Sequence, residues 1–217
     1  MKYVARLFVT IVLLALAACS TEQGPASSET NTRTSTRSPG DLADLIDAGA
    51  LSVVRANGNG SSSGASVEGI IHNTSSSNVH VDIVMSRPVF FRNGGRGQNM
   101  IGSMVLNRDN SYSQYRGNSF VSLKPNEQAS VKFIAYCADF EKDNPTSIDR
   151  FTVDTPPPHL VHVMNRIANY ARANPDADLT VPAQVAVWLA QGVEAGEIAS
   201  RFPFTASDEA LARSFLQ

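Results

Sequence analysis

The fold class is decided by the stretch VHVDIV at residues 79–84. Val79, Val81 and Ile83 fall on one face of an extended strand, and the residues between them fall on the other face. The stretch VKFIAY at residues 131–136 alternates in the same way. A period of two indicates β-strands with one buried face.

Similar stretches recur between residues 50 and 136. We expect strands at 51–56, 67–72, 79–85, 88–91, 100–106, 119–123 and 129–136. Turns rich in Gly, Asn, Ser and Pro separate them. Short strands at this spacing predict an antiparallel β-sandwich of the immunoglobulin-like type. The turn LKPNEQ at residues 123–128 resembles one that precedes a final strand in extracellular immunoglobulin-like modules.

Helical periodicity flanks the strands on both sides. Leu42, Leu45 and Ile46 share one face of a short helix before Gly49. Apolar residues at helical spacing also predict helices over 160–173, 180–192, 193–202 and 207–215, the last with Ser207 as its N-cap. The expected fold class is therefore α+β, with an immunoglobulin-like sandwich followed by a small α-helical C-terminal region.

The first residues have the zones of a secretory signal. Lys2 and Arg6 form a basic start, and residues 7–16 form an apolar run that ends in small residues. A helix that spans a bilayer needs roughly 20 apolar residues, so this run is too short to cross the membrane. We expect a cleaved signal peptide.

Leu16-Ala17-Ala18-Cys19 closes this leader and resembles the lipobox of bacterial lipoproteins. The resemblance implies cleavage before Cys19 and a diacylglyceryl group on its thiol. Stable anchoring requires more than one lipid signal, and acylation of the new amine would supply the second. Ser20 resembles the sorting preference for the outer membrane where two membranes exist. The alternative is ordinary cleavage and release.

Composition divides the chain into five segments. We expect a signal peptide over 1–18, a lipidated disordered tether over 19–40, a short helix plus the sandwich over 41–136, an acidic and proline-rich connection over 137–158, and a helical region over 159–217. The tether is rich in Ser and Thr and almost free of apolar residues, so it cannot bury enough surface to fold.

The charge and the cysteine content of the chain bear on its partners and on disulfide formation. The chain has 18 basic and 20 acidic residues, and loss of Lys2 and Arg6 with the leader moves the net charge from −2 to −4. No basic cluster marks a nucleic-acid surface, so we expect no nucleic-acid partner. If Cys19 is lipidated, Cys137 has no disulfide partner and is a buried small hydrophobe. A catalytic thiol paired with a distant histidine is the alternative.

An acidic loop follows the last expected strand. Asp139, Glu141 and Asp143 alternate like the first ligands of an EF-hand calcium loop. The loop departs from that pattern where glycine and the final glutamate are required, because Asn144 and Arg150 stand there. A solvated loop and a calcium site are therefore both open interpretations.

The histidines offer a second arrangement of metal-ligand type. His159 and His162 lie three residues apart on one helix, and His72 and His80 flank a serine-rich turn. Imidazole is a common ligand of zinc and copper, so convergence of the two pairs would create a metal site. Exposed or hydrogen-bonded histidines are the alternative.

No nucleophile elbow, phosphate loop or paired-cysteine motif occurs in the sequence. We therefore expect a membrane-anchored exported lipoprotein that acts as a non-catalytic binding module of the bacterial cell envelope, without a cofactor. Its partners would be the membrane, through the N-terminal lipid, and an envelope protein or polysaccharide. The alternative is an envelope hydrolase or a calcium- or zinc-dependent enzyme, with Cys137, a histidine and the acidic loop at the seam between sandwich and helices.

Overall fold

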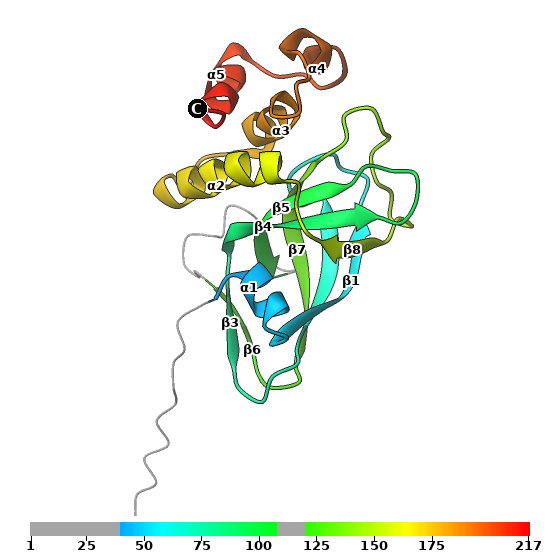
Figure 1. Ribbon diagram of the computed structural model, residues 1–217, viewed down its shortest axis with the longest axis vertical. Helices are drawn as coiled ribbons and strands as arrows, with labels where there is room; N and C mark the ends of the chain where they lie inside the picture. Colours follow the sequence, from blue (N-terminus) through cyan, green and yellow to red (C-terminus); the bar gives the residue numbers. More distant parts are fainter. Residues whose placement is uncertain (1–39, 108–119) are drawn as a thin grey trace, which may run out of the picture. The chain divides into compact units, whose positions relative to one another are not determined.

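A computed structural model describes residues 40–107 and 120–217 (Figure 1). The strands are β1 (Leu51–Gly58), β2 (Val67–Asn73), β3 (Val79–Asp82), β4 (Val84–Asn93), β5 (Met100–Asn107), β6 (Phe120–Leu123), β7 (Gln128–Cys137) and β8 (Phe151–Asp154). The helices are α1 (Leu42–Asp47), α2 (Pro158–Ala173), α3 (Thr180–Leu189), α4 (Ala195–Arg201) and α5 (Ala206–Ser214). The predictions for the signal peptide, the lipobox, Cys19 and the tether up to residue 39 lie outside the described residues.

Most of the described strands belong to one antiparallel sheet with the order β1-β2-β7-β5-β4-β8. Its two terminal strands meet, because a backbone bridge joins Asn57 of β1 to Arg150 just before β8. The sheet is therefore nearly closed on itself. β3 and β6 pair separately, and Gly40 bridges to Val81 of β3.

The mixed α+β class, the antiparallel strands and the C-terminal helices are confirmed. The immunoglobulin-like pair of packed sheets is not confirmed, since six strands share one curled sheet. Strand β8 corrects the sequence interpretation, because residues 137–158 were expected to be only a connection. The stretch FTVD at 151–154 instead pairs with β4 at the sheet's edge.

Aromatic side chains fill the interior of the sheet. The rings of Phe91 and Phe133 lie 4.9 Å apart, and that of Phe151 lies 6.1 Å from Phe91. Gly69 on β2 allows this packing, since a Cβ atom there would lie 2.6 Å from the ring of Phe133. Close-packed interiors leave no room for that atom.

Asp41 links helix α1 to strand β4. Asp41 caps the helix by accepting a hydrogen bond from the backbone N–H of Ala43 at 3.0 Å. Its other carboxylate oxygen accepts hydrogen bonds from the backbone N–H groups of Ser86 and Arg87. One side chain therefore joins the start of α1 to the first half of the long strand β4.

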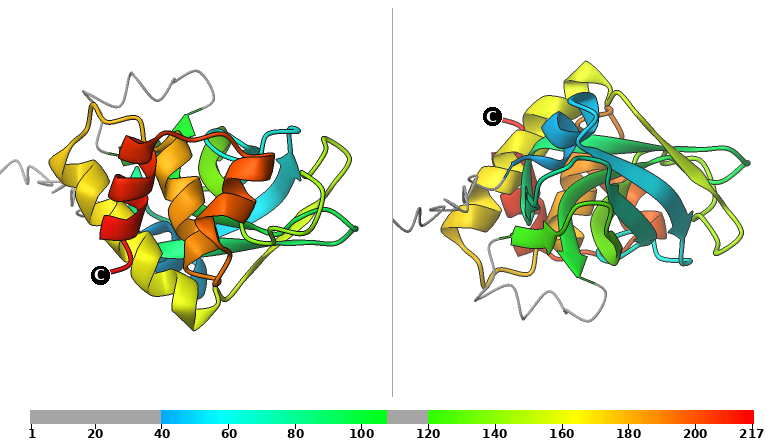
Figure 2. Two further views of the ribbon diagram at one scale, coloured as in Figure 1. Left: turned by 90° about the horizontal axis from the view of Figure 1, so that it is seen from above. Right: turned by 90° about the horizontal axis from the view of Figure 1, so that it is seen from below.

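Helices α2 to α5 gather over one end of the sheet (Figure 2). α2 packs on β4 through its apolar face, and α3 packs against both β7 and α5. The N-cap of helix α5 is Thr205, whose side chain forms a capping box with Asp208, and not Ser207 as the sequence predicted. In the described part of the chain, no helix has the length and apolar character needed to cross a bilayer.

Candidate functional site

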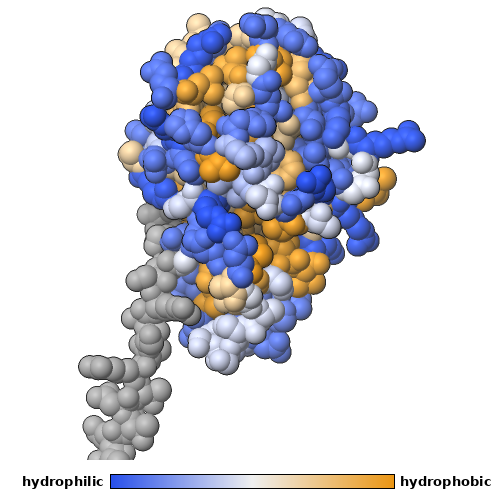
Figure 3. Space-filling model, in the orientation of Figure 1, coloured by the Kyte–Doolittle hydropathy of each residue, from blue (hydrophilic) through white to orange (hydrophobic). Residues whose placement is uncertain are grey.

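Strands β1 and β8 separate beyond their bridge and leave a groove. A hollow of about 610 Å³ opens between them. Its lining residues come from α1 and the turn after it, from β1, from the residue after β2 and from β8: Ile46, Gly49, Leu51, Ser52, Val53, Val54, Thr74, Phe151, Thr152 and Val153. Figure 3 shows hydrophobic surface in the region that α1, β1 and β8 occupy in Figure 1.

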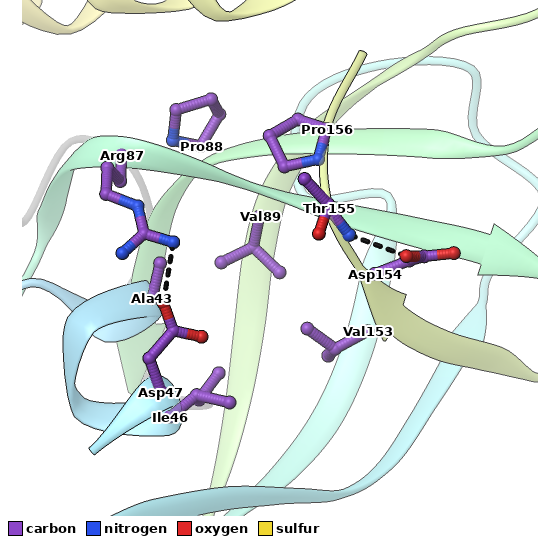
Figure 4. A pocket seen from close by; sticks show the side chains of 10 residues that line it. All are labelled: Ala43, Ile46, Asp47, Arg87, Pro88, Val89, Val153, Asp154, Thr155 and Pro156. Atoms are coloured by element: carbon purple, nitrogen blue, oxygen red, sulfur yellow. Dashed lines mark hydrogen bonds and ion pairs between the residues drawn. The ribbon is translucent and has the colours of Figure 1, made fainter. Parts of the chain in front are cut away.

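A second hollow of about 270 Å³ continues the first one toward β4. The two share Ile46 and Val153, so they form one continuous surface, which we call the β1–β8 groove. Figure 4 shows that the side chains of Ile46, Val89 and Val153 lie between charged groups at its two sides. The floor of the groove is therefore apolar, and its rim is polar.

Both walls of the groove are strand edges. β1 and β8 are the terminal strands of the sheet, and among the described residues the bridge from Asn57 to Arg150 is the pairing that joins them. Val54 lies at an irregularity in β1 and is 54% exposed, and Val153 on β8 is 36% exposed. Backbone N–H and C=O groups on such edges are ready to pair with another strand.

Ion pairs lie along the rim of the groove. Arg87 bonds Asp44 at 2.6 Å and Asp47 at 2.8 Å, both on α1, and these hydrogen bonds raise the pKa of its guanidinium. Arg92 bonds Asp154 at 2.5 Å, and this hydrogen bond, together with one from a neighbouring backbone N–H, lowers the pKa of the Asp154 carboxyl. The first of these contacts holds α1 in place beside the groove.

Positive charge lies at the closed end of the groove. Arg55 of β1 and Arg150 line a further hollow of about 330 Å³, together with Glu68. Both arginines are exposed, and neither forms an ion pair with any residue that the structure describes. An acidic group bound here would meet two guanidinium groups that form no salt bridge within residues 40–107 and 120–217.

A second candidate site lies between the sheet and the helices. This pocket, which we call the Gln98 pocket, has a volume of about 230 Å³. It is lined by Ser62, Gln98, Phe140, Lys142, Asp143, Asn144, Trp188, Arg201 and Phe202. The ring of Trp188 packs edge-on against Phe140 at 5.2 Å and against Phe202 at 5.3 Å. The acidic loop thus does reach the seam between the sheet and the helices.

Two of the three carboxylates of the possible calcium loop form contacts within the protein. Asp139 accepts hydrogen bonds from the backbone of Asn99 at 2.7 Å and from Lys142 at 3.1 Å. Glu141 pairs with Arg201 at 3.4 Å, and Asp143 is exposed at the pocket. Over residues 40–107 and 120–217, no group of three or more His, Cys, Asp or Glu side chains could hold a metal ion.

The histidines do not converge either. His159 and His162 are exposed on α2. His72 bonds Asn126 at 3.0 Å, and His80 bonds Ser122 on β6 at 2.9 Å. His72 and His80 lie on β2 and β3, which belong to different sheets, so these described strands do not pair across the serine-rich turn.

Cys137 is a buried small residue, as expected from the sequence. Its exposed fraction is 0%, and burial, assisted by the nearby charge of Asp139, raises the pKa of its thiol. Its Sγ atom lies 3.5 Å from the sulfur of Met100 and 3.9 Å from Oδ1 of Asn144. Nucleophilic chemistry requires the thiolate, which this environment disfavours.

Comparison with known protein families, with curated proteins and with solved structures found no match for this chain. The two surfaces described above therefore carry the functional interpretation. The β1–β8 groove offers strand edges above an apolar floor, and the Gln98 pocket offers buried polar groups among aromatic rings.

Proposed function

We propose that this chain is an exported, lipid-anchored, non-catalytic binding module of the bacterial cell envelope, and that its β1–β8 groove binds an extended segment of a partner protein. The single observation that carries the binding role is the pair of strand edges that diverge above an apolar floor. An added strand would pair with backbone groups on either side of it. The lipid anchor rests on the resemblance of Leu16-Ala17-Ala18-Cys19 to a lipobox.

The lining of the groove specifies the chemistry of the partner. Side chains on one face of an extended peptide would contact Ile46 and Val153, so that face should be apolar. At the closed end, Arg55 and Arg150 favour an acidic residue. We therefore expect a segment with alternating apolar side chains and an acidic residue at one end.

The environment of Cys137 gives no support to the alternative role as a thiol hydrolase. Its thiol is fully buried and has its pKa raised by burial. Strand addition, by contrast, needs no reactive side chain, and main-chain hydrogen bonds supply its affinity.

Photo-crosslinking in cells tests the groove. The full chain would carry a photoreactive amino acid at Val54, and the matched control would carry it at Ile148, which is 86% exposed and also hydrophobic. We expect a specific cross-link at Val54, to a segment with the pattern described above. A synthetic peptide of that segment should bind the full chain and slow amide hydrogen exchange in Leu51 to Val54.

Three outcomes would contradict the groove proposal. Equal cross-linking at both positions would indicate non-specific contact. A peptide that binds without protecting β1 amides would exclude strand addition. A cross-link to residues 1–39 of the same chain would mean that the occupant is not a separate protein.

The lipid anchor needs a separate test. Substitution Cys19→Ser should abolish incorporation of labelled fatty acid and leave an uncleaved precursor. Cys137→Ser is the matched control, and it should be processed like the unaltered chain. If Cys19→Ser is still cleaved and fractionates with the membrane, the lipobox assignment fails, while the groove proposal stands on its own test.

A further inference from the structure

The β1–β8 groove is blocked at one end. The backbone bridge between Asn57 and Arg150 brings β1 and β8 into direct contact there. Beyond the bridge, residues 145–149 cover the edge of β1, because the carbonyl oxygen of Asp149 accepts hydrogen bonds from the side chain of Asn57 at 3.2 Å and from the backbone N–H of Gly58 at 3.4 Å. A Cβ atom on Gly58 would lie 2.8 Å from the backbone of this segment, so no further chain fits between them.

A strand that lies between β1 and β8 must therefore end at the bridge or turn away from it. Neighbouring strands in a sheet lie about 4.7–4.9 Å apart, so an added strand requires edges that are about twice this distance apart. The two edges are separate where Leu51–Val54 and Phe151–Val153 line the hollow, and they meet at Asn57. One end of the bound segment thus lies at the bridge.

Two arginines lie at this end, one on each edge. Arg55 directly follows Val54 on β1, and Arg150 directly precedes Phe151 of β8. Both arginines line the hollow of about 330 Å³, where Glu68 is the one acidic lining residue, so the lining has a net positive charge. Both are exposed, and neither forms an ion pair within residues 40–107 and 120–217. Their guanidinium groups are therefore available to an anion.

We infer, on the basis of the strand addition proposed above, that the β1–β8 groove binds the C-terminal end of a partner chain and that Arg55 and Arg150 bind its terminal carboxylate. A C-terminus meets both conditions at once, because the chain stops at the bridge and its last group is an anion. Arginine binds carboxylates through paired N–H donors. A bound N-terminus would instead place an ammonium group beside two guanidinium groups, which repel it. The acidic group expected at this end is then the terminal carboxylate itself.

The same arrangement fixes the direction of the bound segment. β1 runs toward the bridge from Leu51 to Gly58, and β8 runs away from it from Phe151 to Asp154. A segment whose C-terminus lies at the bridge is thus parallel to β1 and antiparallel to β8. Its preceding residues extend toward Ile46, where the groove continues.

Three forms of one peptide test the inference on the full chain. The peptide STVTVTV, acetylated at its N-terminus, alternates apolar and polar side chains, and main-chain hydrogen bonds supply the affinity in strand addition. We would compare its free acid, its C-terminal amide, and the amide of STVTVTD, in which the carboxylate lies on a side chain instead. The free acid should bind about tenfold more tightly than either amide, because only its terminal carboxylate forms the charge-assisted hydrogen bonds with the arginines.

Variants connect this preference to the two arginines. Arg55→Gln and Arg150→Gln each remove one guanidinium group, and each should reduce the preference for the free acid to about threefold or less. Arg166→Gln is the matched control, because Arg166 is also exposed and lines none of the hollows along the groove. A tenfold preference that both Arg55→Gln and Arg150→Gln retain would place the carboxylate elsewhere and overturn the inference.

Further outcomes distinguish a failure of this inference from a failure of the groove proposal. If the free acid and the amide bind equally and both slow amide hydrogen exchange in Leu51 to Val54, strand addition stands but the terminal carboxylate is not recognised. If the amide of STVTVTD binds as tightly as the free acid, an acidic side chain suffices and the inference is overturned. If no form binds, the groove proposal fails and the inference fails with it. In cells, a cross-link from Val54 to an internal segment of the partner would overturn the inference and leave the groove proposal intact.

Discussion

Gln184 of α3 and Cys137 at the end of β7 exchange two hydrogen bonds. The Oε1 atom of Gln184 accepts from the backbone N–H of Cys137 at 2.7 Å, and its Nε2 atom donates to the backbone oxygen of Cys137 at 3.0 Å. Gln184 has no exposed surface. Its amide pairs with the strand as a neighbouring strand would, and this contact fixes α3 against the sheet.

Replacement Gln184→Met should destabilise the protein strongly. It removes both hydrogen bonds and leaves the buried carbonyl group of Cys137 without the partner described here, so we expect a loss of about 2–4 kcal/mol in the free energy of unfolding. Gln191→Met is the matched control, because that amide makes one partly buried bond, to Val187 at 2.9 Å. Urea unfolding measures both, and equal losses would refute the special role of Gln184.

Gly69→Ala should also be destabilising, through overpacking. The added Cβ atom would lie 2.6 Å from the ring of Phe133 and 2.9 Å from the backbone oxygen of Arg55. Overpacking of this kind costs about 1–3 kcal/mol. Gly196→Ala on α4 meets no atom within 4 Å, and it should instead stabilise the helix by about 0.5–1 kcal/mol. Thermal melting of the two variants should therefore shift in opposite directions, and a neutral Gly69→Ala would contradict the packing described here.

The strands were predictable because one face of each is buried. The arrangement of the strands could not be predicted, because closure of the sheet depends on β8. This strand has only four residues, FTVD, which lie between an acidic loop and a run of prolines. Pro88 was expected to begin a strand, yet it lies inside β4, where the pairing with β5 is interrupted between Val84 and Val89. A proline cannot donate to a ladder, so it falls at such an irregularity.

The sequence predicted where the acidic loop lies, but not the contacts that its carboxylates make. The acidic loop does lie beside the helices, but Asp139 and Glu141 are used in internal contacts. Gln98 and Trp188 are 90 positions apart in the sequence, and no local pattern connects a glutamine after a glycine-rich turn with a helical tryptophan. The contact of α3 with β7 through Gln184 brings Gln98 and Trp188 together. This contact joins residues far apart in the sequence, so no hydrophobic periodicity predicts it.

Acid should weaken the closed end of the β1–β8 groove. Asp149 accepts hydrogen bonds from the backbone N–H of Thr146 at 2.6 Å and from its hydroxyl at 2.8 Å, and these bonds lower the pKa of its carboxyl below the ordinary value of 3.8. The backbone oxygen of Asp149 also accepts hydrogen bonds from Asn57 and Gly58 of β1. A lowered pKa means that this stabilisation is complete above the unfolded value and is lost as pH falls through the folded one.

The measurable consequence is a difference between variants at two pH values. Because Asp149 is only partly buried and solvent screens its charge, Asp149→Asn should lower stability at pH 6 by less than about 1 kcal/mol. It should have a smaller effect at pH 2.5, where the native carboxylate is increasingly protonated. Asp143→Asn is the control, since that carboxylate accepts no hydrogen bond from any residue within the described ranges. A loss for Asp149→Asn that is the same at both pH values would exclude the proposed role of the carboxylate.

Cys137 should be inert toward alkylation in the native full chain. Its exposed fraction is 0%, and burial is the main cause of its raised pKa, so iodoacetamide should react only when the protein unfolds. Gln184→Met should accelerate the reaction by loosening α3 from β7, whereas Gln191→Met should not. Rapid labelling of the native protein would contradict the buried position.

After complete unfolding, alkylation with iodoacetamide measures the number of free thiols in each chain. The chain contains two cysteines, Cys19 and Cys137. If Cys19 carries a thioether-linked lipid, as the lipobox resemblance implies, denatured protein isolated from its native host should take up one alkyl group per chain, and mass spectrometry should place it on Cys137. Uptake of two groups would show that Cys19 is present as a free thiol, and the lipid anchor would then have to be abandoned. Protein made without the leader's processing machinery is the control, and it should take up two.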